Sequence, residues 1–241
     1  MDTNYIILTG KPKMELIKII DLGKVYNPES IPVEAVRHLD LTIDKGEFTA
    51  IVGPSGSGKT TLLNLIGGLD TPTYGKIFID GTNIAELKSS DMVEYRLHHI
   101  GFVFQAYNLI PVLSARENVE FIMLLQGIKK GERQKRAKEL LSAVGLGDRM
   151  ESRPNQLSGG QQQRVAVARA LASHPAFVLA DEPTANLDSG STESLLDLMG
   201  RLNRDYNMTF IFSTHDARVI KRAERVITLE DGMIKPVDSI D

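Results

Sequence analysis

The chain has 241 residues, enough for one large α/β domain or one domain with an inserted subdomain, whereas two independent domains would be cramped. With 42% hydrophobic and 24% charged residues, its composition is that of a globular protein and favours neither a disordered chain nor a fibrous repeat. The net charge of −3 lacks the basic excess that attracts nucleic acid, and the absence of cysteine excludes disulfides, thiolate metal sites and a cysteine nucleophile.

The N-terminal region predicts a short extension followed by a strand. Residues 1–15 are expected to be poorly ordered, and polar residues interrupt their apolar runs, so they do not resemble a signal peptide. Leu16–Leu22 alternates like a strand and Asn27–Pro32 is typical of a loop, so we expect one folded domain over residues 16–241. No apolar window approaches the ~20 residues that cross a bilayer, so direct insertion into the bilayer is not expected.

A strand, a glycine-rich loop and a helix are predicted next. Glu47–Val52 is a short apolar run, and Lys59–Leu69 has apolar residues at helical spacing. The segment between them matches G-x-x-x-x-G-K-[ST], whose backbone N–H groups cradle phosphates at the positive end of a helix. Lys59 is expected to reach the β- and γ-phosphates of a nucleotide, and the Thr60 hydroxyl to ligate a magnesium ion (Mg2+). The alternative, an ordinary glycine-rich turn, is disfavoured by this setting. The expected nucleotide contacts are Gly53, Pro54, Ser55, Gly56, Ser57, Gly58, Lys59, Thr60 and Thr61.

The middle of the chain is predicted to be mainly helical. Lys76–Asp80 and Ile100–Phe104 are strand-like, while Ala115–Leu125 and Glu132–Val144 have the periodicity and composition of helices. The basic run Lys129–Lys138 could suggest a nucleic-acid contact. Because acidic residues interleave with it, a solvated helix face is the better interpretation, and no nucleic-acid partner is expected.

From Ser158 onward, helices alternate with strands. The expected order is a helix to about Ser173, a buried strand Phe177–Ala180, a helix Ser191–Leu202, a strand Thr209–Phe212, a short helix and a strand Val226–Leu229. Such alternation with apolar strands implies a parallel sheet. Asp231-Gly232 predicts a hairpin between Val226–Glu230 and Met233–Val237.

Two carboxylates follow the predicted strand Phe177–Ala180, at the edge where a parallel sheet exposes its working residues. Asp181 fits a magnesium ligand, and Glu182 is placed to orient or deprotonate an attacking water. On its own, a solvated acidic turn before Pro183 would be an equally good interpretation. The glycine-rich phosphate loop favours the catalytic one.

Leu157–Gln161 forms a second anion-binding helix start, because Ser158 is a plausible N-cap and two glycines leave backbone amides open. The first loop already accounts for the nucleotide's phosphates. The economical arrangement is therefore a nucleotide sandwiched between two chains.

Leu157–Gln161 also resembles the signature motif of ABC ATPases, and the other motifs of that family occur in order from about Leu16 to Met233. Tyr26 resembles the aromatic that stacks on adenine and Gln105 the Q-loop glutamine. Asp188 resembles the D-loop aspartate and His215 the switch histidine. Taken singly, Tyr26 would be an ordinary core or surface aromatic, Gln105 a loop glutamine, and the remaining histidines structural.

The resemblance implies a P-loop NTPase (RecA-like) α/β core with a parallel sheet, an N-terminal antiparallel β subdomain and a helical subdomain inserted at about residues 88–165. It implies an ATPase that converts ATP and water to ADP and phosphate. The residues implied in catalysis are Lys59, Gln105, Glu182 and His215; those implied as magnesium ligands are Thr60, Gln105 and Asp181; and those offered to the partner's ATP are Ser158, Gly159, Gly160, Gln161 and Asp188.

The same resemblance implies two partners. One is a second ATPase subunit, expected to be an identical chain; the other is a transmembrane permease that contacts the region Gln105–Leu125 and holds the chain at the cytoplasmic face of the inner membrane. The wording of the motifs is closest to the group that serves lipoprotein release, macrolide export and cell-division signalling. A DNA-repair ATPase would need a long coiled coil between Lys59 and Ser158, and a translation factor would need two cassettes. An ATP-driven signalling subunit that moves no substrate remains an alternative.

Overall fold

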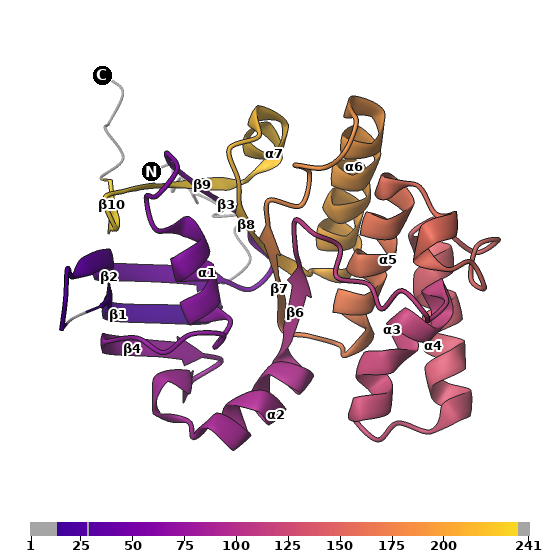
Figure 1. Cartoon of the computed structure of the whole chain (residues 1–241), viewed down its shortest axis with the longest axis horizontal. Helices are drawn as coiled ribbons and strands as arrows, with labels where there is room; N and C mark the ends of the chain where they lie inside the picture. Colours follow the sequence, from indigo (N-terminus) through magenta and orange to yellow (C-terminus); the bar gives the residue numbers. More distant parts are fainter. Residues whose placement is uncertain (1–13, 28, 236–241) are drawn as a thin grey trace, which may run out of the picture.

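The computed structural model describes residues 14–27 and 29–235 and contains two sheets with helices around them (Figure 1). The predicted extension, except for Met14 and Glu15, lies outside the described residues. One sheet has four strands in the order β2-β1-β4-β5 and is antiparallel. The other has six in the order β10-β9-β3-β8-β7-β6, and its strands from β9 to β6 are parallel.

The antiparallel sheet consists of β1 (Glu15–Tyr26), β2 (Val33–Asp44), β4 (Tyr74–Ile79) and β5 (Thr82–Asn83). The prediction of a strand at Leu16–Leu22 is confirmed, and β1 extends it to Tyr26. Strand β2 was not among the predicted elements. Its signal is the alternation of Leu39, Leu41 and Ile43, all buried, with the exposed residues between them, as expected for a sheet with one face in the core.

The parallel sheet consists of β3 (Phe48–Val52), β6 (Ile100–Val103), β7 (Phe177–Asp181), β8 (Thr209–Ser213) and β9 (Arg225–Glu230), with β10 (Met233–Ile234) as an antiparallel edge. The predicted hairpin is confirmed: β9 pairs with β10, and Asp231 and Gly232 between them have φ of 47° and 79°. In the register, Ser213 pairs with both Ile51 and Asp181. The segments after β3, β7 and β8 therefore meet at one edge.

The described helices include α1 (Lys59–Ile66), α2 (Ser89–His99), α3 (Ala115–Leu125), α4 (Lys130–Ala143), α5 (Gly159–Ala172), α6 (Ser189–Tyr206) and α7 (Ala217–Arg222), with 3-10 turns at Ile84–Glu86 and Pro154–Gln156. Helix α3 has the predicted bounds, and Ser114 and Glu117 form a capping box at its start. Helix α1 ends three residues before the predicted end, because Gly67 caps it and Gly68 has a φ of 60°. Helix α2 was not predicted individually.

Successive core-strand residues face opposite sides and build two cores. Leu179 and Ile211 face the core shared with α1 and the antiparallel sheet, whereas Val178, Phe210 and Phe212 face the core shared with α3, α4, α5 and α6. In Figure 1 the antiparallel sheet and the helices α3 and α4 accordingly lie on opposite sides of the parallel sheet. Among the described residues, no helix is both long and apolar enough to span a bilayer.

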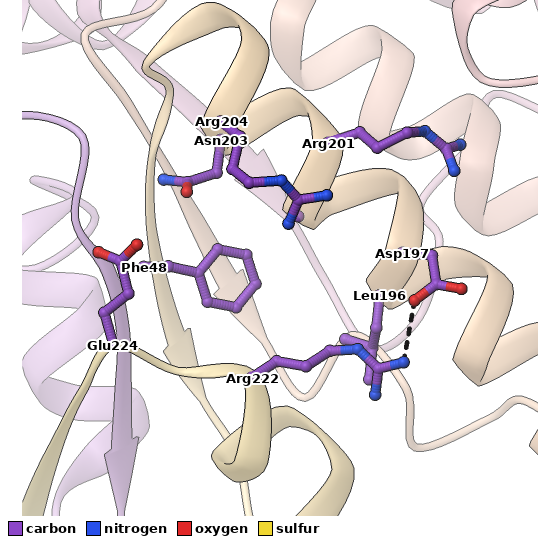
Figure 2. Close-up of a pocket in the computed structure, with 9 residues that line it drawn as sticks. Phe48, Leu196, Asp197, Arg201, Asn203, Arg204, Arg222 and Glu224 are labelled. Atoms are coloured by element: carbon purple, nitrogen blue, oxygen red, sulfur yellow. Dashed lines mark hydrogen bonds and ion pairs between the residues drawn. The ribbon is translucent and has the colours of Figure 1, made fainter.

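A different cavity lies at each end of the strands of the parallel sheet. At the edge where β3 begins, Phe48, Glu224, Arg222 and residues of α6 line a cavity of about 340 Å³ (Figure 2). The edge where β3, β7 and β8 end carries the predicted site residues.

Candidate functional site

The glycine-rich loop connects the end of β3 to the start of α1, as predicted. Gly58 is the N-cap residue of α1 and has a φ of 101°, which an L side chain rarely adopts. A Cβ atom there would lie 2.2 Å from the carbonyl oxygen of Ala35, so only glycine fits. No side chain caps the helix, so the amides of its first turn stay available for an anion.

A cleft of about 640 Å³ opens over this loop. It is lined by Ala35, Gly53, Pro54, Ser55, Gly56, Gly58, Lys59, Thr60, Thr61, Gln105, Glu182, Ala185, Ser213 and His215. The structure thus brings the loop together with Gln105, Glu182 and His215, which come from three other parts of the chain.

The cationic and hydroxyl groups of the loop have defined positions. The ammonium of Lys59 donates hydrogen bonds to the carbonyl oxygens of Gly53 (2.9 Å) and Pro54 (2.8 Å), so it lies against the loop itself. The Thr60 hydroxyl lies 3.3 Å from both carboxylate oxygens of Asp181. A hydroxyl beside a carboxylate is a set of hard oxygen ligands, and it fits a magnesium ion that also binds nucleotide phosphates. The described residues hold no group of three or more His, Asp or Glu that could bind a metal unaided.

Glu182 and His215 form a direct pair at the rim of the cleft. The Nδ1 atom of His215 lies 2.8 Å from Oε1 of Glu182, and the Thr214 hydroxyl donates to Oε2 at 3.3 Å. The His215 side chain is 76% exposed and that of Glu182 only 18%. Glu182 has a φ of 46°, a left-handed conformation that costs a non-glycine residue about 1–2 kcal/mol. Such strain persists where surrounding contacts fix it, as is common at functional sites.

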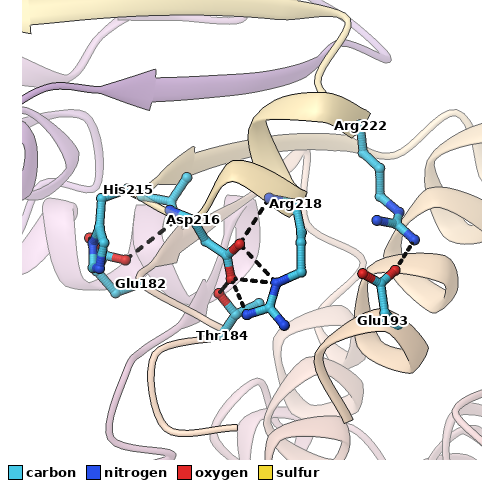
Figure 3. A network of polar contacts seen from close by, with 8 residues as sticks. Glu182, Thr184, Glu193, His215, Asp216, Arg218 and Arg222 are labelled. Carbon is cyan, nitrogen blue, oxygen red and sulfur yellow. Dashed lines mark hydrogen bonds and ion pairs between the residues drawn. The ribbon is translucent and has the colours of Figure 1, made fainter. Parts of the chain in front are cut away.

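A polar network behind this pair joins two loops (Figure 3). Asp216 caps the start of α7 and accepts a hydrogen bond from the Thr184 hydroxyl at 3.0 Å. The Arg218 guanidinium donates to the same carboxylate and, against the opposing effect of burial, lowers the pKa of Asp216 to about 2. The sequence did not lead us to predict a role for Asp216; its position directly before a short helix is the N-cap signal that could have identified it.

Tyr26 is not among the residues that line the cleft, and the residue is 37% exposed. Its hydroxyl donates to Asp70 at 2.7 Å, and the Lys24 ammonium lies 2.6 Å from the other oxygen of that carboxylate and 5.0 Å from the Tyr26 ring. Burial raises the pKa of Asp70, but hydrogen bonds from Lys24 and Tyr26 outweigh it and bring the pKa below its ordinary value. Asp70 therefore anchors Tyr26, a contact that sequence reasoning did not identify.

The signature segment lies outside the cleft. Ser158 and Gln161 form a capping box at the start of α5, with the Gln161 N–H donating to the Ser158 hydroxyl at 3.3 Å. Asp188 caps α6: its carboxylate accepts hydrogen bonds from the N–H and the hydroxyl of Ser191, which lower the pKa of Asp188. A Cβ atom on Gly160 would lie 2.7 Å from the Ser191 hydroxyl, so the starts of α5 and α6 are in contact. None of Ser158, Gly159, Gly160, Gln161 and Asp188 lines the cleft of its own chain.

Comparison with known proteins gives consistent results. A family model described as "ABC transporter" matches residues 36–185. An uncharacterized ABC transporter ATP-binding protein of Thermotoga maritima is 46% identical over 93% of this chain and 95% of its own. A macrolide export ATP-binding/permease protein, MacB of Hyphomonas neptunium, is 48% identical over 91% of this chain, which spans only 34% of that relative.

A solved structure of the cassette MJ0796 resembles the chain with a TM-score of 0.84 and 43% identity, covering 92% of this chain and 97% of that one. A relative of this chain that carries the name MJ0796 comes from Methanocaldococcus jannaschii. The solved structure is described as a dimeric post-hydrolysis state bound to ADP and Pi. The match over more than half of the chain and the fold agree with the sequence motifs. The chain belongs to the ABC transporter family and is one of its ATP-binding, ATP-hydrolysing domains.

Proposed function

We propose that two copies of this chain enclose two ATP molecules head to tail and that hydrolysis drives a membrane-spanning export partner. One observation supports the proposed dimer. Lys59, Glu182 and His215 share a cleft, while the capped helix start at Ser158 lies outside it. A complete set of ATP contacts therefore requires Ser158, Gly159, Gly160, Gln161 and Asp188 of a second copy. The dimeric structure of the relative MJ0796 supports this arrangement.

The residues at the cleft have different roles in hydrolysis. Lys59 and the first amides of α1 bind the β- and γ-phosphates. Thr60 and Gln105, with Asp181 next to Thr60, would hold magnesium, which would neutralise the charge that develops on the phosphates. Glu182 accepts a proton from the water whose oxygen attacks the γ-phosphorus, and ADP leaves as the bond to the β-phosphate oxygen breaks. His215 keeps the Glu182 carboxylate in place through the 2.8 Å contact and so acts by positioning.

An apolar groove on the surface is evidence for a membrane-spanning partner. It has a volume of about 630 Å³, and Leu69, Val93 and Leu125 on its lining are each about half exposed. The groove includes Asn108, Ile110 and Phe121 from the predicted docking region Gln105–Leu125, and it continues onto α2. Large exposed apolar residues gathered at one groove mark an interaction site. We propose that a short cytoplasmic helix of the permease binds here and holds the chain at the cytoplasmic face of the inner membrane.

The names of the relatives suggest which kind of cargo the permease moves. MacB proteins, whose names describe macrolide export, combine an ATP-binding and a permease part in one chain, and this chain corresponds to about a third of their length. We propose a drug, lipoprotein or peptide as cargo of the permease.

The test of hydrolysis is phosphate release by the wild type and by Glu182→Gln. The substitution removes the base and keeps the shape, so we expect turnover to fall at least a hundredfold while ATP still binds. Normal turnover by Glu182→Gln would remove Glu182 as the base.

A further inference from the structure

One buried side chain contacts the backbone beside two of the proposed catalytic residues. Gln163 lies on α5, five positions after Ser158, and is fully buried. Its Nε2 atom donates to the carbonyl oxygens of Phe104 (3.3 Å) and Pro183 (2.8 Å). Phe104 directly precedes Gln105, and Pro183 directly follows Glu182. We propose that Gln163 is a positioning residue that sets Gln105 and Glu182 together and links both to the helix that begins at Ser158; this rests on the proposed function of those residues.

Helix α5 binds the backbone on both sides of Gln105. Gln163 binds the backbone before Gln105, and the partly buried guanidinium of Arg169 donates to the carbonyl oxygens of Tyr107 (3.0 Å) and Asn108 after it. The carbonyl oxygen of Gln105 itself accepts a hydrogen bond from Asn186 at 3.0 Å. With its backbone fixed in this way, Gln105 presents its side chain to the cleft.

On the Glu182 side, the hydrogen bond opposes relaxation of a strained residue. Glu182 has its left-handed φ of 46° directly before a proline, where backbone choice is already restricted. Its N–H donates to the carbonyl oxygen of Ser213 at 2.9 Å, and its own carbonyl accepts from Ala185 at 3.2 Å. The Gln163 amide fixes the next carbonyl, that of Pro183. Without it, the Pro183–Thr184 peptide loses this anchor. The strained backbone at Glu182 then relaxes, and the carboxylate leaves the position that His215 and Thr214 define.

The chemistry of Gln163 indicates that its donors matter. Both Nε2 hydrogens are used, whereas the buried Oε1 atom has no hydrogen-bond partner within the described residues. A buried acceptor without a partner is destabilising, so the amide brings a local cost that its two donated hydrogen bonds must offset. The amide fits a role in which two loops from different parts of the chain must be held in register.

The test compares Gln163→Met with a matched control, Asn203→Leu. Asn203 on α6 is also buried, and its Nδ2 atom donates to two backbone carbonyls, of Gly46 (2.7 Å) and Met208 (2.8 Å). It lines the cavity at the opposite edge of the sheet from the ATP cleft (Figure 2). Each substitution is nearly isosteric and leaves two carbonyls without a donor, so thermal unfolding should shift similarly in both variants.

We expect Gln163→Met to lower kcat for ATP hydrolysis at least tenfold while the Kd for ATP, measured by titration, stays within twofold. Asn203→Leu should keep kcat within twofold of the wild type. Gln163→Asn retains an amide that reaches only one of the two carbonyls, so its kcat should fall between those of the wild type and Gln163→Met. It provides the test if Gln163→Met does not fold.

Equal kcat values for the position-163 variants and Asn203→Leu would overturn the proposal, as would a parallel loss of ATP affinity. The wild type and Glu182→Gln are measured alongside. If Glu182→Gln keeps normal turnover, the proposed function fails; if it loses turnover and Gln163→Met does not, only the role of Gln163 fails.

Discussion

Replacing Gly58 by alanine tests whether the phosphate loop is fixed by close backbone packing. The new Cβ would lie 2.2 Å from the Ala35 carbonyl oxygen, and β2 would have to move by about 0.8 Å to reach the 3.0 Å lower limit for such contacts. The left-handed φ of 101° costs alanine about 1–2 kcal/mol. Overpacking of this kind adds about 1–3 kcal/mol, and the stiffer unfolded chain returns about 0.4–1 kcal/mol. These terms sum to about 1–4.6 kcal/mol, and we expect a net loss in the middle of that range, about 2–4 kcal/mol.

The matched variant is Gly56→Ala in the same loop. Gly56 also has a positive φ, of 80°, but no heavy atom lies within 4 Å of the added Cβ. Only the conformational penalty applies, so the expected loss is at most about 1.5 kcal/mol. In urea unfolding, with an m of about 3 kcal/mol/M, the midpoint should fall by about 0.7–1.3 M for Gly58→Ala and at most about 0.5 M for Gly56→Ala. Equal shifts would refute the claim that the Ala35 contact fixes the loop.

Three further predictions concern the surroundings of the cleft. Asp216→Ala removes a helix cap and should lower Tm by roughly 2–4 °C at pH 7. Because the folded pKa of Asp216 is about 2, below the unfolded value of ~3.9, its contribution is present above pH ~4 and lost as the pH falls towards 2, so the Tm difference should shrink in acid; a constant difference would contradict this. Tyr26→Ala should weaken ATP binding by about 1–3 kcal/mol in a titration if Tyr26 stacks on adenine, and unchanged affinity would exclude that role. Leu125→Asp in the apolar groove should abolish co-purification of the membrane partner; continued co-purification would exclude this groove as the docking site.

Most helices and strands could be predicted because neighbouring residues in the sequence determine where they begin and end. The Ser114–Glu117 capping box fixes the start of α3, and the apolar run from Phe177 ends in Asp181 as expected for a strand buried on both faces. Strand β2 was not predicted, although the alternation of Leu39, Leu41 and Ile43 with exposed residues is a local signal of a strand with one buried face.

Contacts between distant segments could not be predicted in the same way. That Gln105 and Glu182 line one cleft depends on the order of strands in the parallel sheet. The anchoring of Tyr26 by Asp70 depends on the pairing of β1 with β4, because Asp70 lies between α1 and β4. Gln163 had a weak local signal. It lies three and four positions before the buried Ala166 and Val167, so helical periodicity places this polar residue on the buried face. Its two acceptors, in contrast, become visible only in the folded chain.

We propose that each ATP is enclosed between the Lys59 loop of one chain and the Ser158 helix start of another. The most direct test is the molar mass of Glu182→Gln, measured by light scattering after gel filtration with magnesium and ATP. We predict that ATP doubles the mass of Glu182→Gln and that adding Ser158→Arg to the same chain prevents the doubling while each monomer still binds ATP. A monomeric Glu182→Gln with ATP bound, or a dimer that Ser158→Arg leaves intact, would contradict the account.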